Sequence, residues 1–224
     1  MPVYNHTCAE VGNSGAGLCV MQHLWTGGSD TPATLYTQYR VRYYIDGEAT
    51  ASVNIPVGFG AGEPYGDDDG PWSAGSAFGK TGEPSGLFNS FPIPFAKSIN
   101  ITVEIVQGGK PGSLTSGGFW IIVRGRTLMA AQADELTFPL PGSAGVLLPH
   151  TARLKTVENS NVPVPGGATM ALFNSTAARG AVYLVVLEVD ALGGPSFLEG
   201  CFRYVHKQAA VACVFGPILM TDCL

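Results

Sequence analysis

The sequence predicts an all-β protein built from β-sandwiches, and the clearest sign is one predicted hairpin. Residues Tyr39–Ile45 alternate between apolar and polar side chains, which is the pattern of a strand with one buried face. Asp46 and Gly47 follow, and both residue types tolerate the positive φ of a tight turn. Ala49–Ile55 alternates again, and Pro56 ends the strand because it has no backbone N–H to donate. The two segments are therefore expected to pair antiparallel.

Further short strands are predicted along the whole chain, separated by turn-forming residues. The 224 residues include 30 glycines and 16 prolines, so turns are frequent. The other predicted strands are Leu18–Thr26, Ile99–Ile105, Phe119–Val123, 152–156, Met170–Phe173, Ala181–Val189, Phe197–Val205 and Val211–Leu219. Many short strands with turns between them predict jelly-roll β-sandwiches, one complete and a second shorter or incomplete.

The chain is expected to fall into two halves. Residues 1–125 would form an N-terminal arm, up to residue 17, and the first jelly roll. Residues 126–150 would connect it to a second, shortened β-sandwich at 151–224. Thr127–Leu136 is the one short helix expected, and Gly58–Gly86 is the longest irregular stretch, which favours a functional or interfacial loop.

Composition narrows the possible partners. Only 13% of residues are charged, against about 25% in an average soluble domain, which indicates either a large core or extensive contact between subunits. The net charge of −5 and the lack of a basic run argue against nucleic acid. The longest apolar run, Ala209–Met220, is shorter than the roughly 20 residues that span a bilayer. No membrane span is therefore expected.

Asparagine and cysteine positions favour an extracellular or cell-surface location over a cytosolic one. Three N-glycosylation triplets begin at Asn5, Asn100 and Asn174. The five cysteines, which lie near the two ends of the chain, are Cys8, Cys19, Cys201, Cys213 and Cys223. They are candidates for disulfides, the alternative being buried small apolar side chains. No CxxC pair indicates zinc, and neither metal nor cofactor is expected.

Several sequence words, taken in order, resemble glycoside hydrolase family 172. These words are HLW at His23–Trp25, YIDGE at Tyr44–Glu48, NIPVG at Asn54–Gly58, FPIPF at Phe91–Phe95 and SFLEG at Ser196–Gly200. The resemblance covers most of residues 15–205. The family comprises α-fructofuranosidases and difructose dianhydride synthases, built as paired jelly rolls in symmetric oligomers, so it implies that fold here.

The same resemblance implies a catalytic pair that this chain completes only in part. Glu199 corresponds to the family nucleophile, and a retaining glycosidase needs a second carboxyl about 5 Å away. Asp222 is the one carboxyl that could stand in for the family's acid/base, without the glycines that shape the family's loop. Alternatively, Glu199 is structural and binds a backbone group or Arg203.

Two functions therefore compete. The first is a secreted, self-assembling structural protein, an oligomer or filament subunit that is catalytically inactive. The second is a retaining glycoside hydrolase acting on α-fructofuranosides. The expected partners are other copies of the chain, by strand exchange or edge pairing, and carbohydrate. The segments expected to be exchanged are the arm before Cys19 and the tail 209–224.

Overall fold

A computed structural model describes residues 2–8, 18–28, 39–62, 71–82, 86–105, 119–128, 137–138, 146–147, 153–159, 162–163, 165, 168 and 170–172. The chain divides into two compact units, Met1–Leu187 and Glu188–Leu224, and every described residue belongs to the first. The predicted division into two sandwiches at residues 126–150 stays a prediction.

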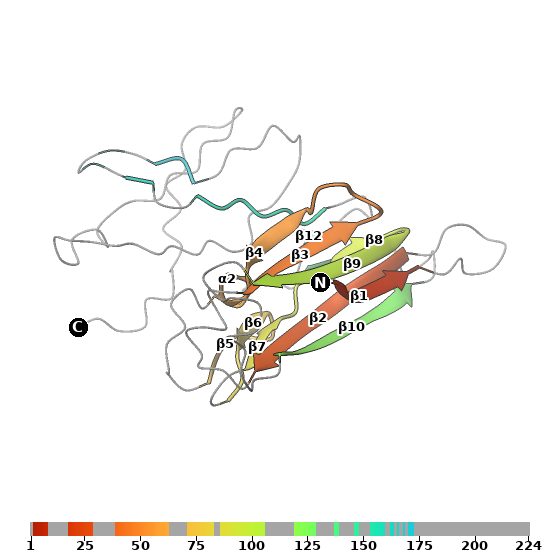
Figure 1. Cartoon of the computed structure of the whole chain (residues 1–224). Coiled ribbons are helices and arrows are strands. Elements are labelled where there is room, and N and C mark those ends of the chain that lie inside the picture. The colour runs from red at the N-terminus through yellow and green to blue at the C-terminus, as the bar shows by residue number, and fades with distance from the viewer. Residues whose placement is uncertain are drawn as a thin grey trace. The chain divides into compact units, whose positions relative to one another are not determined.

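The first of two main sheets, sheet A, has four antiparallel strands (Figure 1). In spatial order they are β1 (Pro2–Thr7), β9 (Ser98–Ile105), β3 (Tyr39–Ile45) and β4 (Val53–Pro56). The short helix α2 (Val57–Gly60) follows β4 directly. Sheet A thus combines the N-terminus with the predicted hairpin.

The second sheet, sheet B, has six strands, and its long central strand is β2 (Leu18–Gly28). The other strands of sheet B are β10 (Phe119–Leu128), β7 (Gly86–Asn89), β6 (Phe78–Lys80), β5 (Trp72–Ala74) and β8 (Ile93–Phe95). Their order is β10-β2-β7-β6-β5, with β8 also paired to β2. A separate two-stranded ladder joins β11 (Thr137–Phe138) to β12 (Val146–Leu147).

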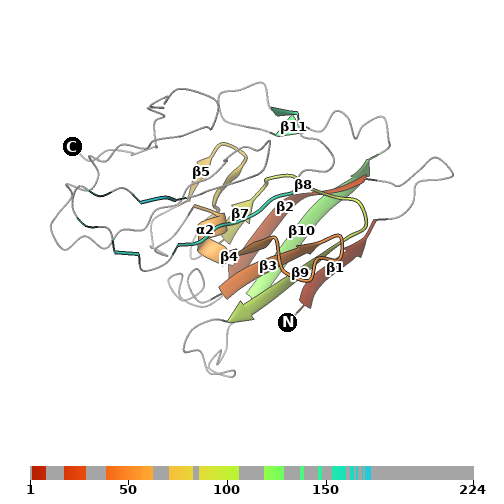
Figure 2. The same cartoon turned by 90° about the horizontal axis from the view of Figure 1, so that it is seen from above.

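Sheets A and B pack face to face around one apolar core (Figure 2). The side chains that alternate inward from β3 and β9 are buried, among them Ile45, Ile99 and Ile101, and they share this core with Met21 and Phe95 of sheet B. The all-β sandwich predicted from the sequence is confirmed, while its jelly-roll topology stays a prediction.

The predicted hairpin is confirmed, with a longer connection than expected. Val41 pairs with Ile55 and Tyr43 with Val53 in antiparallel register. The second strand begins at Val53 rather than Ala49. The Glu48 carboxylate explains the delay, because it accepts a bond from the Ile45 backbone N–H at 3.1 Å and another from the Ser52 hydroxyl. These bonds hold the intervening residues in a turn.

The predicted strands 152–156 and Met170–Phe173 are wrong at their described residues, because 153–156 and 170–172 form no strand. Three other expectations were wrong in part. The N-terminal arm is not free, because Pro2–Thr7 forms β1 and pairs with β9. The expected helix Thr127–Leu136 cannot begin at Thr127, since Thr127 and Leu128 end strand β10, and the rest of that segment lies outside the described residues. The stretch Gly58–Gly86 contains α2, β5 and β6, because its short apolar words at Trp72–Ala74 and Phe78–Lys80 pair with each other.

A disulfide joins the two sheets where the chain first passes between them. Cys8 follows β1 and Cys19 lies near the start of β2, and their sulfur atoms are bonded across a sequence separation of 11. Closing a loop of this length stabilises a fold by about 3 kcal/mol in the chain-entropy account. This pair confirms two of the five cysteine candidates, and Cys201, Cys213 and Cys223 lie outside the described residues.

The Asp46 carboxylate connects three segments that are distant in sequence. Asp46 has φ of 55°, and its Oδ1 accepts bonds from the backbone N–H groups of Ala96, Lys97 and Ser98 at 2.9, 2.6 and 3.2 Å. Its Oδ2 accepts a bond from Arg153 Nη2 at 2.6 Å. Asp46 therefore fixes the loop from β8 to β9, where the chain passes from sheet B to sheet A.

We expect Asp46→Ala to lower the free energy of unfolding by about 2 to 3 kcal/mol, because three N–H groups lose a charged acceptor. Asp46→Asn keeps an acceptor and should cost less. Urea titration of the purified protein measures both changes. A loss within about 0.5 kcal/mol for Asp46→Ala, as for an ordinary surface substitution, would contradict the proposed role.

Candidate functional site

The outward face of sheet A is polar and closely paired. Arg42 on β3 forms an ion pair with Glu104 on the neighbouring strand β9, and Arg40 forms one with Glu158. Asn54 of β4 accepts bonds at its Oδ1 from Arg40 Nε at 3.0 Å and from Arg42 Nε at 3.2 Å. Because both guanidinium groups are bound to carboxylates, this face does not present a simple cationic surface for nucleic acid.

Residues 153–159 run beside β4 and cover the edge of sheet A. The Thr156 N–H donates to the Ser52 carbonyl at 3.1 Å, and the Asn54 N–H donates to Thr156 Oγ1 at 3.0 Å. Arg153 binds Asp46, and the Leu154 side chain packs against the core. This segment is therefore held against the edge of sheet A.

A hollow of about 490 Å³ lies on the outward face of sheet A near the Asp46 turn. It is lined by Asn5, Tyr44, Gly47, Glu48, Ser98, Asn100 and Thr102. Asn5 and Asn100 are direct cross-strand neighbours, and Tyr44 is the neighbour of Asn100 on the other side. The hollow thus combines amide and hydroxyl groups with one aromatic ring and one carboxylate.

The outward face of sheet B is aromatic. His23 on β2 stacks on Phe88 of β7 with ring centroids 6.1 Å apart, and its Nδ1 is 2.8 Å from the Ser90 hydroxyl. Trp25, next along the same face of β2, donates from Nε1 to Thr81 Oγ1 at 3.0 Å. His23 and Trp25 therefore lie on one face of β2.

The aromatic face continues onto β10, where it is exposed. Ile122 is the cross-strand neighbour of Trp25, and Trp120 lies two residues before it. Trp120 is 55% exposed and Ile122 is 45% exposed. These two side chains are the large exposed apolar groups that the described part of β10 presents.

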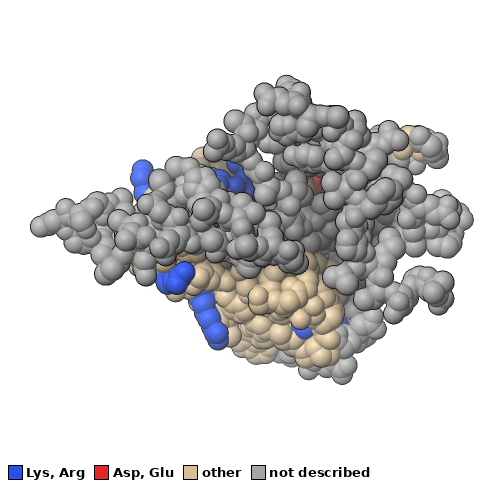
Figure 3. Space-filling view, turned by 180° about the vertical axis from the view of Figure 1, so that it is seen from behind, with Lys and Arg blue, Asp and Glu red and all other residues tan. Residues whose placement is uncertain are grey.

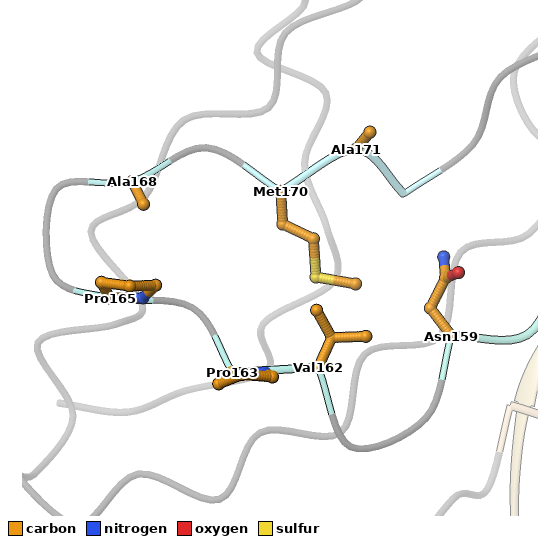
Figure 4. A pocket seen from close by; sticks show the side chains of 7 residues that line it. All are labelled: Asn159, Val162, Pro163, Pro165, Ala168, Met170 and Ala171. Carbon is orange, nitrogen blue, oxygen red and sulfur yellow. The ribbon is translucent and has the colours of Figure 1, made fainter.

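A second hollow of about 300 Å³ is lined by described residues between Asn159 and Ala171 (Figure 4). The Met170 side chain points toward Val162, and Pro163 and Pro165 form the adjoining wall. Asn159 contributes the one side-chain amide among the described lining residues. These lining groups carry no titratable proton, so they provide no acid/base chemistry.

The described residues do not contain the predicted catalytic pair. Glu199 and Asp222 both lie outside them, so their separation and their roles stay predictions. Within the described part of the chain, no group of three or more His, Cys, Asp or Glu side chains could hold a metal ion.

The glycosylation candidates differ in their positions. Asn5 is exposed on β1, whereas Asn100 is half-buried on β9 between two other strands, and Asn174 lies outside the described residues. The Asn100 Oδ1 atom is shielded from solvent without a hydrogen-bond partner. Sequence alone treats the three triplets alike and does not separate them.

Sequence reasoning missed two further features of these surfaces. Lys80 is only 2% exposed, although its strand of three residues gave no signal that a lysine would be buried. The polar row Asn5–Asn100–Tyr44 was also missed, because it requires the pairing of β1 with β9. The alternation within each strand did indicate which side chains point outward.

Comparison of the chain with models of known protein families and with curated protein sequences finds no match. Among the described residues, no helix is both long and apolar enough to cross a membrane. The resemblance to glycoside hydrolase family 172 therefore rests on the sequence words alone.

Burial lowers the pKa of the His23 imidazole below its usual range, and the Arg124 guanidinium lowers the pKa further. The unfolded chain therefore binds a proton at His23 at higher pH than the folded chain does. The contribution of His23 to stability is full above the ordinary value of about 6.5 and decreases as the pH falls below it.

The free energy of unfolding of the wild type should fall between about pH 7 and about pH 5, because His23 takes up a proton more readily in the unfolded chain. We expect the fall to be smaller in His23→Gln. Urea titrations across this range measure the slope. His6→Gln, which replaces an exposed histidine on β1, is the matched substitution for comparison. An unchanged slope in His23→Gln would show that His23 protonation does not affect folding.

Proposed function

We propose that this chain is a secreted structural protein that associates with copies of itself through its β-sandwich. The observation that carries the proposal is the exposed apolar pair Trp120 and Ile122 on β10. Within the described residues β10 pairs with β2 alone, so it lies at an edge of sheet B. An edge strand with apolar side chains is a surface on which another chain can dock.

The charge distribution supports the same proposal. Charged residues make up only 13% of the chain. The described surface in Figure 3 is mostly uncharged, with scattered lysine and arginine side chains. A surface with few charged groups can be buried against another copy with little cost of removing charges from water.

Two further features support secretion and one mode of assembly. The Cys8–Cys19 disulfide is of the kind that persists in oxidising compartments. Because β1 is already paired within its own sheet, assembly would use the β10 edge and the apolar tail 209–224 rather than the N-terminal arm. Contacts between two different surfaces generate a filament when the rotation does not close, and a ring when it does.

We expect the full chain to form particles much larger than the 23.4 kDa monomer at micromolar concentration. Replacing Trp120 and Ile122 together with serine should weaken association by about 30-fold to 100-fold, since their burial provides about 2 to 3 kcal/mol. Size-exclusion chromatography with light scattering measures the particle mass.

Arg126→Gln is the matched control, because Arg126 is exposed on the same face of the same strand. It should leave the particle mass unchanged. A wild-type chain that remains a stable monomer at micromolar concentration would contradict self-association. Equal effects of the serine and glutamine variants would contradict the assignment to the Trp120 and Ile122 pair, and a serine variant with the wild-type particle mass would contradict the assignment to β10.

The alternative function is a retaining glycoside hydrolase acting on α-fructofuranosides, with Glu199 as nucleophile and Asp222 as acid/base. The observation that favours it is the position of the family-like words. HLW lies on β2, YIDGE on β3 and its turn, and FPIPF around β8, so these words belong to the sandwich core and its connections. Asp222 nevertheless lies in a sequence without the glycines that shape the family's loop around its second carboxyl.

We expect the purified chain not to hydrolyse an aryl α-fructofuranoside, because a nucleophile without a placed acid/base cannot protonate the leaving oxygen. Release of the aryl group is measured by absorbance, with Glu199→Gln as the matched variant. Turnover that disappears in Glu199→Gln would establish the enzyme and displace the structural proposal.

A further inference from the structure

The hollow on the outward face of sheet A has a lining that suits one class of ligand. Its centre is the row Asn5–Asn100–Tyr44, which crosses three adjacent strands at one register position. Side chains at directly paired positions lie about 5 Å apart on the same face of a sheet. Two amides and a phenol ring are therefore presented together to a molecule about the size of a sugar ring.

Charge excludes several ligand classes from this hollow. Among the described residues its one charged lining group is Glu48, and that carboxylate is occupied by the Ile45 N–H and the Ser52 hydroxyl. No described lysine or arginine lines it, which disfavours phosphate and carboxylate ligands. A single occupied carboxylate is also too few ligands for a divalent cation.

Hydrogen-bonding capacity points to a neutral polyol. Amide groups both donate and accept, and the Ser98 and Thr102 hydroxyls do the same, so the lining matches a ligand that carries several hydroxyls. The Asn100 Oδ1 is shielded from solvent and has no partner, so it can accept a bond from a ligand only when the amide turns its oxygen toward the hollow. The Tyr44 ring supplies an apolar surface for the C–H face of a sugar.

We propose that this hollow binds a saccharide ring, seated over Asn5, Asn100 and Tyr44. The saccharide has two possible sources that share this chemistry. It is either a free saccharide, or the first sugar of an N-glycan carried by Asn5, the exposed residue at the rim. The second source rests on the proposed secretion of the chain, whereas the first does not.

The free-saccharide source is tested on the full chain made in a bacterial periplasm, where its disulfide can form and N-glycans are absent. The probes are N-acetylglucosamine and sucrose, followed by the side-chain amide signals of Asn5 and Asn100 in ¹H–¹⁵N spectra. We expect saturable shifts of these signals. Tyr44→Ala should weaken binding by about fivefold to tenfold, while Tyr44→Phe, which keeps the ring, stays within about twofold.

The attached-glycan source is tested on the chain secreted from a eukaryotic host. If the Asn5 glycan occupies the hollow, enzymatic removal of the glycan lowers the Tm of the wild type and of Tyr44→Phe. The same treatment leaves the Tm of Tyr44→Ala unchanged, because the stacking surface is already absent. Thermal unfolding of the untreated variants shows that each one folds.

The proposal is overturned if neither probe shifts the two amide signals and glycan removal leaves the Tm unchanged. Shifts that are equal in Tyr44→Ala and the wild type would also overturn it, since binding would then occur elsewhere. The spectra are recorded on the variant in which serine replaces Trp120 and Ile122, because weakened association keeps the particle small enough for amide signals to be seen. The outcomes are distinct from a failure of self-association, because the hollow lies on sheet A and the apolar pair lies on sheet B.

Discussion

The sandwich depends on the carboxylate of Asp46. This carboxylate joins the hairpin turn to the loop from β8 to β9, through which the chain passes from sheet B to sheet A. Asp46 and Ser98 exchange bonds, with the Asp46 N–H donating to the Ser98 carbonyl at 2.7 Å and the Ser98 N–H donating to Asp46 Oδ1. The same loop is held from the other side, where the Cys8 N–H donates to the Lys97 carbonyl at 2.8 Å. One acidic side chain thereby aligns β3, β9 and the disulfide-linked end of β1.

This alignment produces two outward faces with different chemistry. Sheet A presents paired ions and, near the Asp46 turn, a hollow lined by amides and hydroxyls. Sheet B presents aromatic rings and, on β10, the exposed apolar side chains of Trp120 and Ile122. A polar hollow suits a small hydroxylated ligand, and an exposed apolar edge suits another protein chain. The two proposals therefore rest on different sheets and can succeed or fail separately.

The sequence predicts the elements whose pattern is local and misses those that depend on pairing. Tyr39–Ile45 and Ile99–Ile105 alternate cleanly, so their buried faces were predictable. Pro2–Thr7 resembled a polar arm because an edge strand buries few of its side chains. Its pairing with β9 joins residues that are distant in sequence, so no local pattern indicates it. The Asp46–Gly47 turn was predicted, but the bonds from Asp46 to residues 96–98 follow from tertiary structure. The candidate catalytic residue Glu199 was predicted from a resemblance, which carries no geometry.

The most direct test of this account is amide hydrogen exchange at Ala96 and Lys97. If the Asp46 carboxylate holds the loop from β8 to β9 in the folded state, both amides should exchange as slowly as those of Ile99 and Ile101 in β9, because their N–H groups are bonded until the sandwich opens. Exchange at the rate of an open, solvent-bonded loop would contradict the account, since the carboxylate would then not fix the chain between the two sheets.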